Sequence, residues 1–121
     1  MKDISFQVTR NCLTLLLPDD LGGIYIDDIR AEILEAIRLR REIKAVIFDC
    51  INLRLIDRVD TQMLVDLVAC IRLMGKQVGF CSIGPGLAAV LVSLNHEMQE
   101  CTYGFNLDDT IAKLYRCTHN A

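Results

Sequence analysis

The sequence predicts a single α/β domain over residues 1–121, with a mixed, mostly parallel sheet, an antiparallel edge strand at the N-terminus and about four flanking helices. Short apolar runs rich in β-branched residues alternate along the chain with longer segments of helical periodicity, and this order produces a parallel sheet. The first two runs, at 4–9 and 12–17, are separated only by Arg10 and Asn11, which predicts an antiparallel hairpin. A length of 121 residues fits one domain.

Residues 18–23 (PDDLGG) break the apolar pattern after the hairpin. A helix is expected from about Asp27 to Arg41, because its apolar residues share one face. Asp27 and Asp28 favour its N-terminus, since acidic side chains stabilise the positive end of the helix dipole. The next strand, residues 44–50, is apolar throughout its middle and is therefore expected at the centre of the sheet.

The second half of the chain repeats the order of strand and helix. A connection over 51–59 leads to a helix of about 60–74, which Gly75 ends. A strand at 78–83 and the turn at 84–86 (GPG) lead into a helix that reaches about Leu94. A short strand at 102–105 and a helix at 107–115 complete the domain.

The charge balance excludes some classes of partner. The net charge is -3 at pH 7, which argues against a nucleic-acid interface because phosphate binding needs clustered Lys and Arg. The only basic cluster closes the first helix, where it either complements the dipole or forms a docking patch; it comprises Arg38, Arg40, Arg41 and Lys44. No apolar run approaches the roughly 18 residues of a membrane span, and no signal peptide is recognisable, so we expect a cytoplasmic protein without a membrane partner.

The six cysteines do not form a short metal-binding motif, so no metal and no cofactor are expected. Most lie in apolar strand and helix patterns, as buried reduced thiols do, and we expect Cys101 and Cys117 to be the most exposed. His96 and His119 have no nucleophile or metal partner at motif spacing. The sequence therefore predicts a protein that is not an enzyme.

One alternative class is a response-regulator receiver, whose acidic cluster accepts phosphate on an aspartate. Asp19, Asp20 and Asp49 superficially resemble that cluster. Only 29 positions separate Asp20 from Asp49 (49 − 20), too few for the helix, strand and helix that the receiver needs, and no Lys-Pro pair follows the last strand. We therefore interpret Asp19 and Asp20 as turn formers.

Several segments together resemble the STAS family, which is named for sulphate transporters and anti-sigma factor antagonists. They are the residues 11–13 (NCL), 46–57 (VIFDCINLRLID), 72–75 (RLMG) and 82–94 (SIGPGLAAVLVSL). The likeness covers nearly the whole chain and is strongest to the single-domain antagonist of the bacterial stressosome, the RsbS type. It implies a mixed sheet flanked by helices, and a protein that binds larger STAS sensor paralogues, further copies of itself and a switch-type serine/threonine kinase. A free anti-sigma factor antagonist is the alternative role.

In this resemblance Asp57 ends the loop before a helix, and Arg58 stands at the position of the phosphorylatable Ser or Thr. A hydroxyl there gains a charge of about -1.5 to -2 when it is phosphorylated, whereas arginine accepts no phosphoryl group and carries the opposite charge. Arg58 is therefore either a partner-contacting residue or a solvated charge near Asp57 and Asp60. Thr61 is either an alternative acceptor or a helix residue whose hydroxyl makes a local bond.

The partner surface is expected where two parallel strands end and pass into helices, because such junctions meet at one end of a sheet. Ser82, just before the second junction, departs from the subfamily, which usually has glycine there. The expected surface comprises Asp57, Arg58, Val59, Asp60, Thr61 and Gln62 at the first junction, and Gly84, Pro85, Gly86 and Leu87 at the second.

Overall fold

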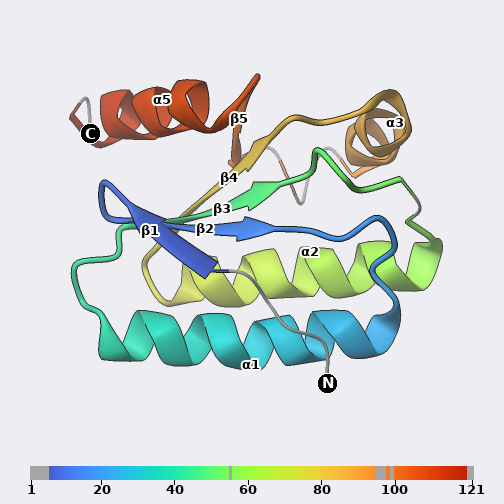
Figure 1. Cartoon of the computed structure of the whole chain (residues 1–121), viewed down its shortest axis with the longest axis horizontal. Coiled ribbons are helices and arrows are strands. Elements are labelled where there is room, and N and C mark those ends of the chain that lie inside the picture. Colours follow the sequence, from blue (N-terminus) through green and yellow to red (C-terminus); the bar gives the residue numbers. More distant parts are fainter. Residues whose placement is uncertain (1–5, 55, 95–97, 99, 120–121) are drawn as a thin grey trace.

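The computed structural model describes residues 6–54, 56–94, 98 and 100–119. Five strands form one sheet in the order β1-β2-β3-β4-β5 (Figure 1). β1 (Phe6–Thr9) and β2 (Cys12–Leu16) form an antiparallel hairpin. β3 (Ala45–Asp49), β4 (Gln77–Cys81) and β5 (Thr102–Gly104) continue the sheet in parallel. The predicted mixed sheet with an antiparallel N-terminal strand is confirmed.

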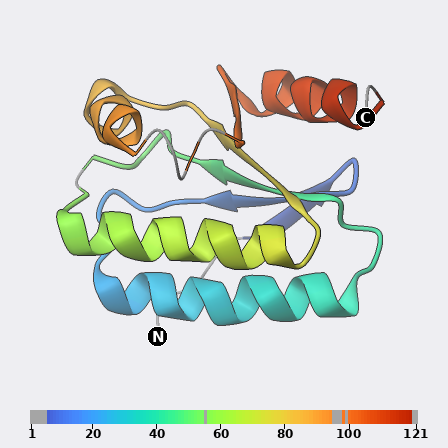
Figure 2. The same cartoon turned by 180° about the vertical axis from the view of Figure 1, so that it is seen from behind.

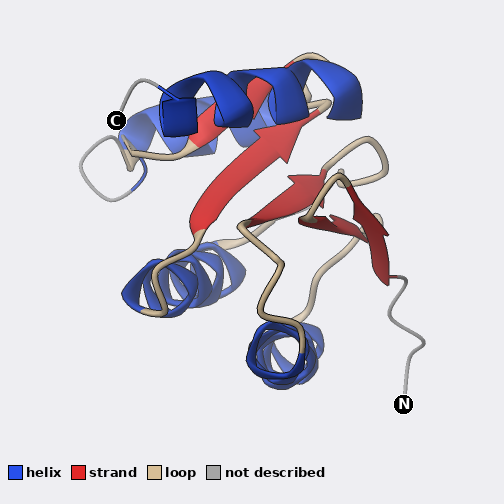
Figure 3. Cartoon of the chain, turned by 90° about the vertical axis from the view of Figure 1, so that its left-hand side faces the viewer, coloured by secondary structure: helices blue, strands red, loops and turns tan. Residues whose placement is uncertain are grey.

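Helices cover both faces of this sheet. α1 (Gly23–Leu39) and α2 (Arg58–Leu73) lie side by side on one face, and α5 (Leu107–His119) lies on the other (Figures 1 and 2). α3 (Pro85–Ser93) lies beyond the ends of the parallel strands, on the same side as α5 (Figure 3). Within the described part of the chain, no helix combines the length and the apolar character needed to cross a membrane.

The two residues of the hairpin turn both have a left-handed backbone. Arg10 has a φ of 51° and Asn11 a φ of 64°, as the twist of a two-residue hairpin requires. Asparagine tolerates this conformation better than most residues do, which explains why two residues suffice to reverse the chain here.

The first helix starts earlier than the sequence indicated. α1 begins at Gly23 instead of Asp27, because Ile26 extends the buried face that Ile29 and Ile33 continue. Asp27 and Asp28 therefore do not open the helix. The residue before α1 is Gly22, whose φ of 64° suits glycine and which supplies no side-chain cap.

The main core lies between the sheet and the pair α1 and α2. Three aromatic rings stack across it on neighbouring strands: Phe48 lies 5.3 Å from Phe80, and Phe80 lies 5.8 Å from Tyr103, measured between ring centroids. A smaller core lies under α5, where Gly104 permits a close approach. A Cβ atom at Gly104 would clash with the hydroxyl oxygen and the backbone of Thr110. The two cores hold α1 and α2 against one face of the sheet and α5 against the other.

Candidate functional site

Two strand-to-helix junctions meet where the parallel strands end, which we call the carboxyl edge of the sheet. β3 passes through residues 50–57 into α2, and β4 passes through residues 82–84 into α3 (Figure 1). β3 and β4 are paired neighbours that run in the same direction, so their ends lie together. The two junctions therefore lie at the same end of the sheet, as the surface predicted from residues 57–62 and 84–87 requires.

Asp57 is the N-cap of α2, in an extended backbone conformation. Its carboxylate accepts a hydrogen bond of 2.8 Å from the backbone N–H of Asp60. The cap satisfies one of the amide groups that have no partner within the helix. Arg58 is consequently the first residue of the helix, two positions before the predicted start at Asp60.

The outer side of the first turn is open to solvent. Arg58 is exposed, and Val59 is 65% exposed. Among the described residues, the Arg58 guanidinium has no ion pair, either with Asp57 or with Asp60. The dipole disfavours a cation at this end of a helix, and no ion pair in the described chain offsets that cost for Arg58.

The inner side of the same turn is buried. Asp60 is only 4% exposed, and its carboxylate accepts a hydrogen bond of 3.2 Å from the backbone N–H of Gly22. The bond joins the start of α2 to the start of α1. Burial raises the pKa of Asp60, and the nearby Asp57 raises it further, whereas the Gly22 N–H opposes this shift.

Thr61 also faces inward and is 9% exposed. Its hydroxyl donates a hydrogen bond of 2.6 Å to the backbone carbonyl of Asp57, one turn earlier. This is the local bond of a helix residue that the sequence left as one of two interpretations. The hydroxyl is thus both bonded and buried in the folded chain.

The second junction begins at Ser82, whose φ of 58° lies in the left-handed region. Glycine adopts this conformation without strain, which gives a physical reason for the glycine that the resemblance places here. Ser82 offsets part of the cost through its hydroxyl, which donates to the backbone carbonyl of Phe105 at 3.3 Å. Gly84 is the N-cap of α3 and Pro85 opens the helix, as predicted.

Not every residue of the expected surface reaches solvent. Asp60, Thr61 and Leu87 are buried and support the surface from below, and Gly84 is half-buried. The exposed residues of the expected set are Asp57, Arg58, Val59, Gln62, Pro85 and Gly86.

The exposed side of α3 is apolar, and the sequence analysis did not include it. Ala88, Ala89 and Val92 are exposed there, and the helix contains no charged residue. The signal was present in the segment 82–94, which has no charge over 13 residues. These exposed apolar side chains follow Pro85 along α3, and apolar side chains of this kind are enriched at the centres of protein interfaces.

No protein-family model matches the chain, and no curated protein matches it. Solved structures do. A serine-to-glutamate variant of RsbS from Moorella thermoacetica is 17% identical, with 98% of this chain and 99% of that chain covered and a TM-score of 0.81. A chain from the molecular architecture of the stressosome, described as a signal integration and transduction hub, is 17% identical, with 94% and 98% covered and a TM-score of 0.76. The unphosphorylated anti-sigma factor antagonist SpoIIAA is 15% identical, with 94% and 98% covered and a TM-score of 0.69.

The chain has the STAS fold. The match extends over nearly the whole length of both chains in each case. Identities of 15% to 17% support the architecture and leave the function to be argued from the surface.

Four cysteines of the described chain are buried free thiols: Cys12, Cys50, Cys81 and Cys101. Cys101 is buried, contrary to the expectation that it would be exposed, because the turn before β5 packs it against the main core. Burial raises the pKa of Cys81 and of Cys101 to about 11 in each case, so both remain thiols at neutral pH. The side chain of Cys117 lies outside the described residues.

No group of three or more His, Cys, Asp and Glu residues in the described part of the chain is arranged to hold a metal ion. Asp19 and Asp20 are exposed in the segment between β2 and α1, and the Asp49 carboxylate accepts a hydrogen bond of 3.1 Å from the backbone N–H of Ile51. His96 and the side chain of His119 lie outside the described residues. The described acidic residues therefore do not form the metal-binding cluster of a receiver.

Proposed function

We propose that this STAS domain is a non-catalytic, cytoplasmic scaffold of bacterial stress signalling, of the stressosome antagonist type, and that Arg58 prevents switching at the usual position. The observation that carries the proposal is the place of Arg58. It is the first residue of a capped helix, it is exposed, and no ion pair within the described chain engages it.

The proposed partners are larger STAS sensor paralogues, further copies of this chain and a switch-type serine/threonine kinase. The likeness to a stressosome chain supports an assembly of STAS domains. The exposed apolar side chains of Val59, Ala88, Ala89 and Val92 support a surface that buries area against proteins, since interfaces combine an apolar centre with a polar rim.

The charge at position 58 decides whether phosphorylation can release a partner. A phosphorylated hydroxyl would add about -1.5 to -2 of charge beside Asp57 and Asp60, and would repel an acidic partner surface. Arginine instead supplies a fixed positive charge. A kinase that binds the surface containing Arg58 would therefore remain bound in the presence of ATP.

Thr61 does not readily replace the missing acceptor. Its hydroxyl is bonded to the Asp57 carbonyl and is buried under the first turn. A kinase would have to open this turn, and with it the Asp57 cap and the link from Asp60 to Gly22, before the hydroxyl could reach a nucleotide. This supports a domain that is permanently unswitched over one that uses a shifted acceptor.

The test is size-exclusion chromatography with light scattering of the chain, alone and mixed with a STAS sensor and a switch kinase, for wild type and Arg58→Ser. We expect a large assembly that retains the kinase with or without ATP in the wild type, and that releases it with ATP only in the variant. A wild-type chain that remains small and ignores both partners would contradict the proposal.

A free anti-sigma factor antagonist is the second candidate, because SpoIIAA also shares the fold over almost its whole length. The same chromatogram separates the two roles. A free antagonist gives a small complex with a single partner and no large assembly with a sensor.

A further inference from the structure

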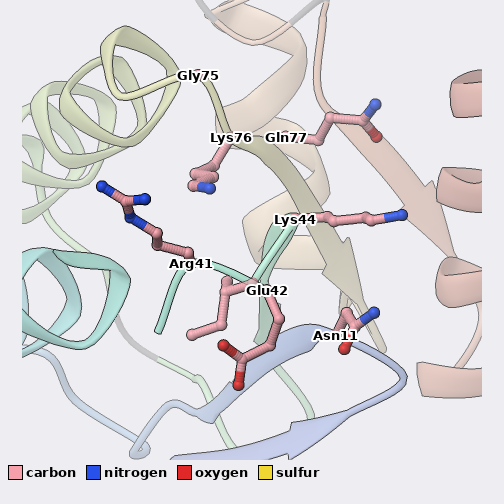
Figure 4. A pocket seen from close by; sticks show the side chains of 8 residues that line it. Asn11, Arg41, Glu42, Lys44, Gly75, Lys76 and Gln77 are labelled. Carbon is pink, nitrogen blue, oxygen red and sulfur yellow. The ribbon is translucent and has the colours of Figure 1, made fainter. Parts of the chain in front are cut away.

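The opposite end of the sheet, which we call the amino edge, contains a separate hollow. Its volume is about 360 Å³, and it lies between the hairpin turn at Asn11, the loop before β3 and the loop before β4 (Figure 4). This volume lies within the roughly 300 to 1,000 Å³ of ordinary small-molecule pockets. β3 and β4 run from this hollow to the carboxyl edge, so the hollow is distinct from the surface proposed above.

Two cations from different loops share the hollow. Arg41 precedes β3 and Lys76 precedes β4, and both side chains extend into the space between the C-terminal ends of α1 and α2 (Figure 4). Neither has an ion pair among the described residues. Two neighbouring cations with no acid between them repel each other unless an anion joins them.

The remaining charged residues do not neutralise this pair. Glu42 points away from Arg41 and Lys76, and its carboxylate accepts a hydrogen bond of 3.1 Å from Arg40 (Figure 4). Lys44 adds a third cation on the side of α5, with its ammonium 5.9 Å from the ring centroid of Tyr115. The amino edge is thus positive in a chain whose net charge is -3.

The helix dipoles account for only part of this positive charge. Each helix C-terminus is equivalent to roughly half a negative charge, so α1 and α2 together supply about one unit against three cations. Several of these carbonyls are already satisfied, because the N–H groups of Gly75 and Lys76 donate to the last turn of α2. The interaction of these cations with the C-terminal ends of α1 and α2 therefore leaves part of the positive charge at the amino edge uncompensated.

We propose that this hollow binds a diphosphate group, held between the guanidinium of Arg41 and the ammonium of Lys76. The planar fork of an arginine and the compact charge of a lysine are the two side chains that bind phosphate oxygens best. The shared chemistry is the diphosphate, whether a free inorganic anion or a nucleoside diphosphate supplies it. This site does not depend on the proposed scaffold function.

The experiment titrates the full chain with inorganic pyrophosphate and, separately, with adenosine diphosphate, by calorimetry and by amide chemical shifts at constant ionic strength. The test variant is Arg41→Gln with Lys76→Gln. The matched control is Arg30→Gln with Arg54→Gln, which removes the same charge elsewhere in the chain. Circular dichroism checks that each variant is folded.

We expect saturable binding of at least one probe, with shifts centred on residues 41–44 and 75–77. The test variant should bind at least about tenfold more weakly, because it loses two charge-assisted contacts, and the control should stay within about twofold of wild type. Tighter binding of adenosine diphosphate identifies a nucleotide site, and equal or tighter binding of pyrophosphate identifies a free-anion site. Binding of neither probe, or equal weakening in test and control variants, would overturn the proposal.

Discussion

The inner and outer sides of the first turn of α2 differ sharply in what holds them. On the inner side, Asp60 and Thr61 are buried and bonded to Gly22 and Asp57. On the outer side, Arg58 and Val59 are exposed, and Arg58 has no ion pair in the described chain. The fold therefore fixes the position of the turn through one pair of residues and leaves the other pair exposed to solvent.

This division assigns different effects to neighbouring substitutions. Changes on the inner side should alter the free energy of unfolding. Changes on the outer side should leave that free energy almost unaltered and should instead change how partners bind.

The sharpest contrast in stability lies within α2 itself. Leu64→Ala removes a side chain that is 2% exposed and should lower the free energy of unfolding by about 2 to 5 kcal/mol. Leu73→Ala makes the same change where the side chain is 88% exposed, and should cost less than about 0.5 kcal/mol. Urea denaturation followed by circular dichroism measures both, and similar losses in the two variants would refute the assigned faces of the helix.

The cap of α2 provides the next effect. Asp57→Ala removes the acceptor of the Asp60 N–H and should lower the free energy of unfolding by about 0.5 to 2 kcal/mol. The control is Asp66→Ala, an exposed aspartate within the same helix, with an expected change below about 0.5 kcal/mol. An unaltered urea midpoint in Asp57→Ala would show that the cap does not hold the turn.

The pH dependence of stability tests the buried Asp60 carboxylate. Its pKa is raised in the folded chain, mainly by burial, so the folded state retains a proton that the unfolded state has already released. Through the window between these two pKa values, stability falls as pH rises. Asp60→Asn has no carboxylate at this position and does not lose stability in this way. Its free energy of unfolding, relative to wild type, should therefore increase through the same pH window and remain constant above it.

Asp109 gives the opposite sign and serves as the control for that titration. The backbone N–H of Phe105, together with Lys113, lowers the pKa of Asp109. A carboxyl group whose pKa is lower in the folded state stabilises that state at pH values above its unfolded-state pKa. This stabilisation is lost as pH falls through the folded-state pKa. The free energy of unfolding of Asp109→Asn, relative to wild type, should therefore fall as pH rises. Thermal melts at several pH values measure this dependence for both variants. Slopes of the same sign for Asp60→Asn and Asp109→Asn would show that the two environments are misassigned.

The smallest stability effect concerns Arg58. Arg58→Ser removes a cation from the positive end of a helix dipole, where no described acid pairs with it, and should raise the free energy of unfolding by about 0.3 to 1 kcal/mol. The same urea measurement applies. A loss of more than about 1 kcal/mol would mean that Arg58 belongs to the internal contacts of the turn.

Much of the fold could be predicted from sequence, because alternating strand and helix patterns are local signals. The Arg10-Asn11 hairpin and the parallel order of the later strands followed from them. The helix starts were less accurate. Aspartates were interpreted as helix openers, whereas Asp60 bonds to Gly22, 38 residues earlier, a contact that no local pattern reveals.

The candidate site could be predicted only as a set of neighbouring residues. Which residues face outward depends on where the helix begins, and the structure places that start at Arg58. Cys101 is buried, and Arg41 and Lys76 line the same hollow, because segments far apart in the chain come together. Such contacts arise from packing and leave no periodic signal in the sequence.

The central claim is that the outer side of the turn carries no phosphoacceptor. The most direct measurement is intact and peptide mass spectrometry after incubation with a switch-type serine/threonine kinase and ATP, for wild type, Arg58→Ser and Thr61→Val. We expect no added phosphate on wild type or Thr61→Val, and one phosphate at position 58 of Arg58→Ser. Phosphate on Thr61 of the wild type, absent from Thr61→Val, would contradict it.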